Sequence, residues 1–232
     1  MKGPDRAVKR RESAKAPAAR IVIVDDHPVV RSGLRMLIED EPDLLVVGEA
    51  GDADEAIRVL DAKKPDLIIV DLSLNGSSGL DLIKRIKSRS SESKMLVSSM
   101  FDESLYAERV LNAGALGYVS KQEAMEKVIE AIRCVLSGRV YLSAAMSDRM
   151  LHRLAKDRQP PERSAVETLS DRELEVFEMI GRGRSTSEIA AQLHLSVKTV
   201  ETHREKIKAK LGLKTAPELY QHAVRWVVEQ GN

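Results

Sequence analysis

Three carboxylates, a hydroxyl and a lysine follow apolar runs in the first half of the chain. Asp25 and Asp26 come directly after the run IVIV, and Asp71 comes directly after LIIV. Ser99 follows MLVS, and Lys121 follows GYVS. Carboxylate oxygens with open positions suit Mg²⁺, a carboxylate can act as a nucleophile, and lysine and hydroxyl groups can hold phosphoryl oxygens. The set therefore predicts a Mg²⁺ site with a nucleophilic carboxylate and a phosphoryl cradle.

A plainer interpretation is that each aspartate only caps the helix that follows it, because aspartate is common at such positions. That interpretation suits any one of these residues taken alone. It does not account for polar groups at the ends of four different apolar runs. Like charges placed so close together would raise one another's pKa unless a cation neutralised them, which also favours a metal site.

The apolar runs alternate with segments of helical pattern, and this alternation predicts how the polar groups are positioned. Five short continuous apolar runs, each followed by a helix, indicate an α/β doubly wound, five-stranded parallel sheet of the flavodoxin-like type. Polar chemistry in such sheets collects at the carboxyl ends of the strands. The expected helices cover about 28–40, 52–63, 78–88, 103–114 and 122–137.

The segments IVIVDDHPVVRSGL, PDLIIVDLSLNGSSGLDLI, MLVSSM and NAGALGYVSK resemble the receiver domain of two-component response regulators. The resemblance implies that Asp71 is the phospho-acceptor and that Asp26 binds Mg²⁺ directly. It implies that Asp25 binds the metal through water and that the backbone carbonyl of Ser73 is a further ligand. The remaining implied residues are the switch hydroxyl Ser99, the switch aromatic Tyr118 and the phosphoryl-binding Lys121. The spacings of 45 residues from Asp26 to Asp71 and 22 from Ser99 to Lys121 are those of the family.

Two positions depart from the receiver pattern, and one implied role has an alternative. Asn75 and Gln122 stand where the family often has proline, so a less rigid loop after Asp71 and a trans peptide after Lys121 are expected. Tyr118 could instead be an ordinary half-buried strand aromatic. If it is a switch, phosphorylation should move Ser99 toward the phosphoryl group and turn the tyrosine ring inward.

The last part of the chain is purely helical in pattern. Four helices are expected at about 171–181, 185–193, 197–211 and 216–229, with a turn at His194-Leu195-Ser196. Such a small bundle contains a helix-turn-helix. The segment LSDRELEVFEMIGRGRSTSEIAAQLHLSVKTVETHREKIKAKLGLKTAPELY resembles the LuxR-type helix-turn-helix. Together the two resemblances imply a response regulator of the NarL/FixJ class.

The third of these helices has the pattern of a helix that reads DNA. Ser196 is a good N-cap, and Val197, Val200, Ile207 and Leu211 mark one apolar side. The opposite side fits the major groove of duplex DNA, and lysines along it would contact phosphates. The residues predicted to serve DNA binding are Ser185, Thr186, Lys198, Thr199, Glu201, Thr202, His203, Arg204, Glu205, Lys206, Lys208, Lys210 and Lys214.

Two features of this domain remain open in the sequence. Glu201 stands where many members of the class carry a base-facing lysine, so it either accepts a hydrogen bond from a cytosine amino group or pairs with Arg204 or Lys208. Trp226 and its valine neighbours on the last helix belong either to the core or to a dimer contact. A helical protein-interaction bundle with a solvated basic surface is the alternative for the whole domain.

The charge distribution supports two separate tasks. Residues 21–136 have a net charge of −7, whereas residues 182–214 have a net charge of +5. Residues 1–19 are expected to form a disordered basic tail, 20–137 the receiver domain, 138–168 a linker with a short helix, and 169–232 the helix-turn-helix domain. A single cysteine, no secretory signal and no membrane-length apolar run predict a cytoplasmic protein without a membrane partner.

The resemblances imply a protein that is not an enzyme beyond Mg²⁺-dependent phosphorylation and dephosphorylation of itself. A sensor histidine kinase would supply the phosphoryl group to Asp71, and a homodimer would bind promoter DNA. Control would pass through release of the helix-turn-helix or through dimerisation. Two other classes remain: a phosphorylation-independent transcription factor with a receiver-like dimer module, and a small phosphotransferase with an unrelated helical tail.

Overall fold

The computed structural model describes residues 17–74, 77–156 and 165–230. Most of the basic tail expected at 1–19, Asn75, and the central part of the linker lie outside these residues. In the described part of the chain, no helix is long and apolar enough to cross a membrane.

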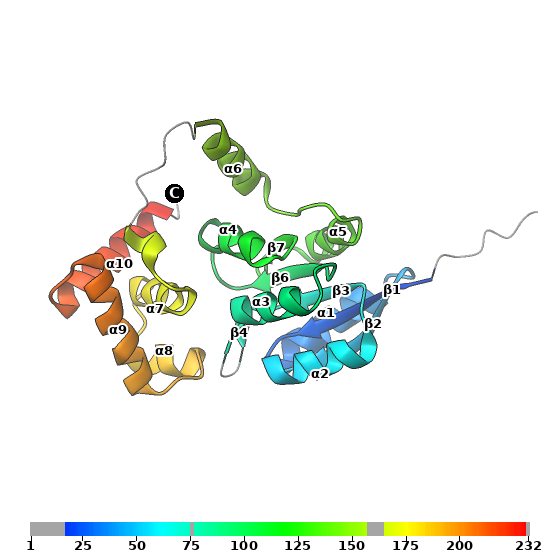
Figure 1. Ribbon diagram of the computed structural model, residues 1–232, viewed down its shortest axis with the longest axis horizontal. Helices are drawn as coiled ribbons and strands as arrows, with labels where there is room; N and C mark the ends of the chain where they lie inside the picture. The colour runs from blue at the N-terminus through cyan, green and yellow to red at the C-terminus, as the bar shows by residue number, and fades with distance from the viewer. Residues whose placement is uncertain (1–16, 75–76, 157–164, 231–232) are drawn as a thin grey trace, which may run out of the picture.

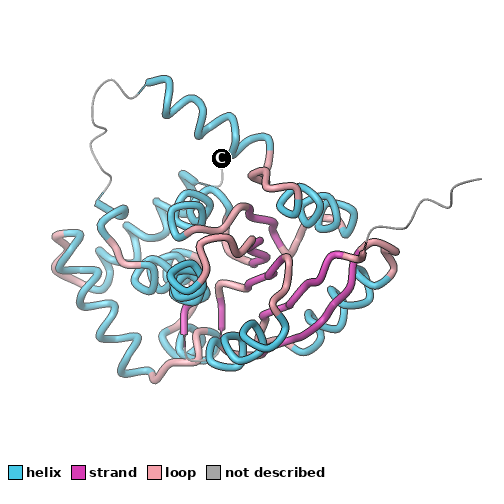
Figure 2. Tube along the Cα trace, turned by 45° about the vertical axis from the view of Figure 1, so that its right-hand side comes forward, coloured by secondary structure: helices cyan, strands magenta, loops and turns pink. Residues whose placement is uncertain are grey.

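The first half contains the five-stranded parallel sheet that the sequence predicts. The strand order is β2-β1-β3-β6-β7, and every neighbouring pair is parallel. Figure 2 shows these strands in the middle of the domain with helices around them. The strands are β1 (Ala19–Val24), β2 (Leu44–Ala50), β3 (Leu67–Val70), β6 (Met95–Ser99) and β7 (Gly117–Ser120).

The helices of this half follow the strands as expected, with one changed boundary. They are α1 (Pro28–Glu39), α2 (Ala53–Lys63), α3 (Gly79–Arg89), α4 (Glu103–Ala113) and α5 (Met125–Leu136). The last of them begins three residues later than predicted, because Ala124 has an extended backbone and serves as the N-cap. The peptide after Lys121 is trans, as are all peptide bonds of the described residues.

Alternate residues of the central strands point to two different cores. Ile21 and Ile23 pack in a cluster with Ile129 and Ile132 of α5. The intervening valines of β1 belong to a second cluster, which lines the side of α3 and α4. This second cluster continues into the C-terminal helices, where it includes Phe177. The two domains therefore share one continuous apolar interior.

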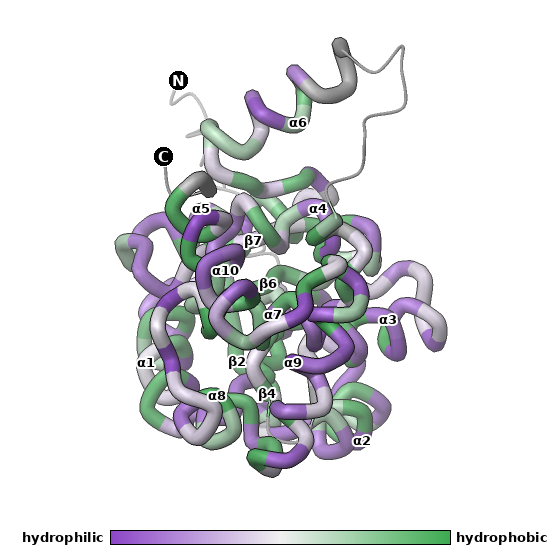
Figure 3. The backbone as a smooth tube through the Cα atoms, turned by 90° about the vertical axis from the view of Figure 1, so that its left-hand side faces the viewer, coloured by the Kyte–Doolittle hydropathy of each residue, from purple (hydrophilic) through white to green (hydrophobic). Residues whose placement is uncertain are grey.

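The second half is a bundle of four helices beside α3 and α4 (Figure 1). These helices are α7 (Asp171–Gly181), α8 (Thr186–Gln192), α9 (Val197–Leu211) and α10 (Ala216–Gln230). In Figure 3, α7 and α10 lie in front of the sheet of the first domain. Serine N-caps fix the predicted starts of α7, α8 and α9. Ser170 and Ser185 form capping boxes, and the Ser196 side chain accepts a hydrogen bond from the backbone of Thr199.

Two local backbone features fix the bundle. A Cβ at Gly181 would lie 2.5 Å from the carbonyl oxygen of Ala223, so the absence of a side chain lets α7 and α10 cross closely. His194, in the turn between α8 and α9, has a φ of 51°, a left-handed conformation that is uncommon for residues other than glycine.

Four further elements complete the described chain. The helix α6 (Ala144–Lys156) matches the short helix expected in the linker and lies at the outer edge of the molecule (Figure 1). A turn of 3-10 helix, η1 (Ala165–Thr168), precedes α7. The strands β4 (Ser73–Leu74) and β5 (Ser77–Ser78) form an antiparallel pair that the sequence did not predict, because two-residue strands have no periodicity to detect.

Candidate functional site

The polar residues predicted to meet at the strand ends do meet. Asp25 follows β1, Asp71 follows β3, and Lys121 follows β7, so parallel pairing brings all three to one edge of the sheet. The Lys121 ammonium lies 2.6 Å from Asp25 Oδ2 and 2.6 Å from Asp71 Oδ2. One cation thus neutralises two carboxylates at this edge.

A close approach of the backbone shapes the loop that carries Asp71. The backbone N–H of Gly79 donates a hydrogen bond to the carbonyl of Leu72 at 2.8 Å. A Cβ at Gly79 would lie 2.0 Å from the backbone carbonyl oxygen of Asp71. Glycine is therefore required where α3 begins, and it allows the chain to return against Asp71, the residue that follows β3.

Burial controls the charge state of this cluster. The Asp71 side chain is 3% exposed, and burial raises the pKa of its carboxyl to about 6, although Lys121 limits the rise. Burial works against the charge of Lys121, yet Asp71 and Asp25 outweigh it, so the pKa of the ammonium lies above its ordinary value. The arrangement keeps a buried carboxylate close to a permanent positive charge.

The cluster has the donor set that a divalent cation requires. Asp25, Asp26, His27 and Asp71 each offer one ligand atom, and these four atoms lie within 4.8 Å of one another. Asp71 Oδ1 is buried and has no hydrogen-bond partner in the described part of the chain. A buried oxygen of this kind is costly unless a partner binds it, so the residues fit a bound Mg²⁺. Ser73, whose carbonyl was predicted as a further ligand, begins β4 two residues after Asp71.

The two predicted switch residues lie on neighbouring strands, Ser99 at the end of β6 and Tyr118 within β7. The Ser99 hydroxyl accepts a hydrogen bond from the backbone N–H of Phe101 at 3.3 Å. The hydroxyl of Tyr118 donates to the carbonyl of Phe101 at 2.6 Å, and its ring is buried. The ring packs in the same core as Tyr106 and Phe177. The ring thus already lies inside the core in this structure, and the inward turn expected on phosphorylation stays a prediction.

A residue of the second domain contacts the acidic cluster, which the sequence did not reveal. The His194 imidazole Nε2 lies 2.9 Å from Asp26 Oδ2, and the side chain of Asp26 is only 1% exposed. The other oxygen of Asp26 lies 2.6 Å from Nδ1 of His27. No local pattern connects residues 168 positions apart, so only the placement of the two domains could show this contact.

The domains are also joined by ion pairs away from the cluster. The Asp171 carboxylate lies 2.7 Å from the ammonium of Lys84 and 2.9 Å from the guanidinium of Arg109. Burial alone would raise the pKa of Asp171, but these two cations hold it below its ordinary value. Ser78 donates a hydrogen bond to Glu175 at 3.1 Å. Each contact joins the receiver side to α7.

Beside these pairs lies a buried acid with a strongly shifted pKa. Glu178 of α7 is fully buried, and burial raises the pKa of its carboxyl to about 7 against the opposing charge of Arg182. Tyr106 and Asp102 of the receiver are among the groups that act on it. The contact between the domains thus encloses an acid whose pKa is raised toward neutral pH.

The predicted DNA-reading side of α9 is exposed while the domains are in contact. Lys198, Glu201, Thr202, Glu205, Lys206 and Ala209 are all exposed. On the opposite side Val200 and Ile207 are buried, as predicted, whereas Val197 is 45% exposed and does not belong to the core. Contact with the receiver therefore leaves the outer side of α9 uncovered.

Several residues predicted to contact DNA have partners within the protein. Lys210 lies 2.6 Å from Glu173, and Lys208 lies 2.9 Å from Glu205. The Arg204 guanidinium donates to the hydroxyl of Thr186 at 3.2 Å. These partners were not predicted from the sequence. The contact between Lys210 and Glu173 joins α9 to α7, whereas that between Lys208 and Glu205 lies within α9.

Other members of that predicted set have local roles or remain open to solvent. Ser185 caps α8, and the Thr199 hydroxyl lies 2.7 Å from that of Ser196. Nδ1 of His203 is buried, and burial lowers the pKa of that imidazole. Lys214 is exposed. Neither ion pair considered for Glu201 is formed, since Lys208 pairs with Glu205 and Arg204 bonds to Thr186.

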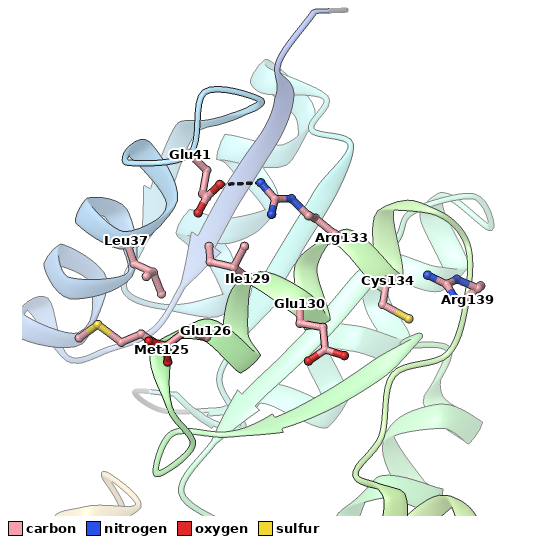
Figure 4. A pocket seen from close by; sticks show the side chains of 9 residues that line it. All are labelled: Leu37, Glu41, Met125, Glu126, Ile129, Glu130, Arg133, Cys134 and Arg139. Carbon is pink, nitrogen blue, oxygen red and sulfur yellow. Dashed lines mark hydrogen bonds and ion pairs between the residues drawn. The ribbon is translucent and has the colours of Figure 1, made fainter.

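A separate hollow of the receiver lies between α1 and α5 (Figure 4). It encloses about 650 Å³, and its lining includes Leu37, Met125, Ile129 and Cys134. The guanidinium of Arg133 on its rim lies 2.5 Å from Glu41. None of the residues of the acidic cluster lines this hollow, so it is a different surface from the candidate site.

Two family models match the two domains. Residues 21–133 match the response regulator receiver domain, and residues 167–223 match the bacterial regulatory proteins of the luxR family. The oxygen regulatory protein NreC of Staphylococcus epidermidis is 37% identical over 211 residues, which cover 89% of this chain and 97% of NreC.

Solved structures give the same result. The RcsB response regulator of Salmonella typhimurium aligns with a TM-score of 0.63 and 27% identity, over 90% of this chain and 98% of that one. RcsB from Salmonella enterica serovar Typhimurium bound to promoter rprA in the presence of the phosphomimetic BeF3- aligns with a TM-score of 0.58 and 27% identity, over 89% and 98% of the two chains. With both domains matched in order along the chain, this protein belongs to the response regulators of the NarL/FixJ class, which join a receiver domain to a LuxR-type DNA-binding domain.

Proposed function

We propose that a sensor histidine kinase transfers a phosphoryl group to Asp71 and that this transfer controls sequence-specific DNA binding by α9. The observation that carries the proposal is the buried Asp71 carboxylate, which has one oxygen held by Lys121 and one oxygen without a hydrogen-bond partner among the described residues. The held oxygen is neutralised, and the other can attack phosphorus.

The protein side chains divide the work of the transfer. Asp71 supplies the attacking oxygen, and its carboxyl must be ionised to do so. Lys121 and the hydroxyl of Ser99 would bind oxygens of the arriving phosphoryl group. Asp26, Asp71, the Ser73 carbonyl and, through water, Asp25 would hold Mg²⁺. The metal, when bound, supplies positive charge that offsets repulsion between these carboxylates and the phosphate donor.

The second half of the proposal concerns how the signal reaches DNA. Because the outer side of α9 is exposed while the domains are in contact, that contact does not hide the helix. It fixes the position of α9 relative to the receiver, and so it constrains two copies of α9 in a homodimer. Two-fold related helices must match the spacing of two half-sites. Added charge at Asp71 acts beside Asp26 and His194, where the domains meet. We place this exchange in the cytoplasm, where DNA and kinase are both accessible.

The labelling test uses acetyl phosphate, Mg²⁺ and the full chain. Intact-mass spectrometry should show one added phosphoryl group on the wild type and none on Asp71→Asn. Asp61→Asn is the matched control, because Asp61 is an exposed carboxylate paired with Arg89 on the receiver surface. Removal of Mg²⁺ should suppress labelling of the wild type. Equal labelling of the wild type and Asp71→Asn would refute the assignment.

The DNA test follows from the same preparation. Titration of one selected DNA site with the unphosphorylated and phosphorylated full chain should show tighter binding after phosphorylation, and Asp71→Asn should show no change with the donor. Identical affinities before and after stoichiometric labelling would refute control of DNA affinity by Asp71. That outcome would favour a transcription factor whose receiver serves only as a dimer module.

A further inference from the structure

His27 is the one member of the metal-binding set that supplies a nitrogen. It occupies the N-cap position of α1, where serine, asparagine or aspartate would normally accept a hydrogen bond from the helix backbone. The His27 side chain makes no such capping bond. Its imidazole is instead directed at the acidic cluster, with Nδ1 at 2.6 Å from Asp26 Oδ1 and 3.6 Å from Asp25 Oδ1. Helix capping therefore does not explain where this ring lies.

The contact between His27 and Asp26 is close but does not have the geometry of a hydrogen bond. Asp26 Oδ1 is buried and has no hydrogen-bond partner among the described residues, although Nδ1 is 2.6 Å away. Two electron-rich atoms so close together repel each other unless a proton or a shared metal ion offsets the repulsion. A metal ion bonded to both atoms removes that repulsion.

A second, independent observation points to the same ion. Asp71 Oδ1 is a buried oxygen without a hydrogen-bond partner, and the ligand atom of Asp71 lies within 4.8 Å of those of His27, Asp26 and Asp25. The spacing suits four ligands around one ion. His194 contacts the other oxygen of Asp26, so the helix-turn-helix does not occupy the nitrogen side of the site.

We propose that His27 is a metal ligand and that the acidic cluster also binds a divalent transition-metal ion through one imidazole and up to three carboxylates. Mg²⁺ takes oxygen ligands and keeps several waters, so it gains little from an imidazole. Zn²⁺, Co²⁺ and Ni²⁺ bind imidazole well, and affinity for such sites rises from Mn²⁺ to Cu²⁺ and falls again at Zn²⁺. His27 thus determines which ion the site prefers. The inference rests on the proposed function, because the carboxylates are the same.

The experiment compares Co²⁺ with Mg²⁺ on the full chain. Isothermal titration calorimetry gives both affinities, and the visible absorption of Co²⁺ reports its ligands. His27→Gln should weaken Co²⁺ binding by about tenfold or more, a loss as large as removing a supporting partner of a metal ligand. Mg²⁺ affinity should stay within about twofold, because His27 gives that ion no oxygen ligand. His194→Gln is the matched control, because it removes the other imidazole on Asp26.

Each outcome decides the inference. Unchanged Co²⁺ binding by His27→Gln, with an unchanged visible spectrum, would refute it. Equal losses of Co²⁺ and Mg²⁺ affinity would also refute it, because His27 would then only orient Asp26. His27→Ala repeats the measurement without an amide oxygen, and a thermal melt verifies the fold of each variant. Acetyl phosphate labelling of Asp71 is read separately, so a failure of the phosphorylation proposal is distinguishable from a failure of the His27 assignment.

Discussion

At the acidic edge of the receiver, the side chains of Asp25 and Asp71 are 2% and 3% exposed, whereas Glu205 on the outer side of α9 is 72% exposed. In the first region burial makes every charge depend on a partner, and Lys121 serves two carboxylates at once. On α9, solvent screens the exposed charges, so the charged side chains that have no partner within the protein are the ones available to DNA. The acidic cluster therefore depends on charges held close together by burial. The outer side of α9 depends on which of its charged side chains have no partner within the protein.

The largest effect is expected from removing the cation of the buried region. Lys121→Met leaves Asp25 and Asp71 together without their neutralising partner. The free energy of unfolding should fall by about 3–5 kcal/mol, the cost of breaking a buried ion pair by removal of one partner. Urea unfolding with and without Mg²⁺ measures this, and Mg²⁺ should stabilise the variant more than the wild type because it binds the folded site.

Lys127→Met is the control for that measurement. Lys127 pairs with Glu123 on the surface, and its side chain is 54% exposed. Exposed pairs of this kind contribute little, so the control should change stability by no more than about 0.5 kcal/mol. Similar losses for the two lysine variants would show that burial does not distinguish the acidic edge from the surface.

A smaller effect is expected where α9 carries an unpaired acid. Glu201 is exposed and forms neither of the ion pairs considered for it, which leaves its carboxylate free to accept from a cytosine amino group. Glu201→Gln should shift one position of the selected DNA site from cytosine toward adenine, because glutamine pairs with adenine in the major groove. The change should be about 1–3 kcal/mol at that base pair.

Binding-site selection on both variants gives the measurement. Glu205→Gln is the matched control, since Lys208 holds the Glu205 carboxylate at 2.9 Å and the same substitution should leave the preferred sequence unchanged. If Glu201→Gln selects the same motif with the same ranking as the wild type, the cytosine contact does not exist.

The smallest expected effect is a difference in the salt dependence of DNA binding between variants of two lysines of α9. Lys206 is exposed, whereas the ammonium of Lys210 is held by Glu173 and by the carbonyl of Thr168. Lys206→Ala should weaken binding to all sequences alike and reduce the slope of log affinity against log salt by about one phosphate contact. Lys210→Ala should leave that slope unchanged. Titrations at several salt concentrations decide the point, and an equal loss of slope in both variants would contradict the role of Glu173.

The acidic cluster could be predicted because parallel strands bring their carboxyl ends together whatever the details of packing. To predict that Asp25, Asp71 and Lys121 meet, only the positions of three apolar runs were needed. The outer side of α9 could also be predicted, because helical periodicity assigns residues to sides. The prediction that Val197 is buried was wrong, because Val197 is the first residue of α9 and no preceding turn of the helix covers its side chain.

The remaining differences involve contacts between distant segments. The pairs Lys210–Glu173 and His194–Asp26 depend on how α9 and the helix-turn-helix are placed against other elements. Local propensity carries no information about such placement. The same applies to Tyr118, whose burial depends on a core shared with the C-terminal helices rather than on its own strand.

The contact of His194 with Asp26 also bears on the kinetics of phosphoryl transfer. The turn between α8 and α9 covers a carboxylate at the edge where any donor must approach. A donor the size of acetyl phosphate needs less open surface at this edge than a protein donor does. We therefore expect contact between the domains to slow phosphorylation of Asp71 by a protein donor more than phosphorylation by acetyl phosphate.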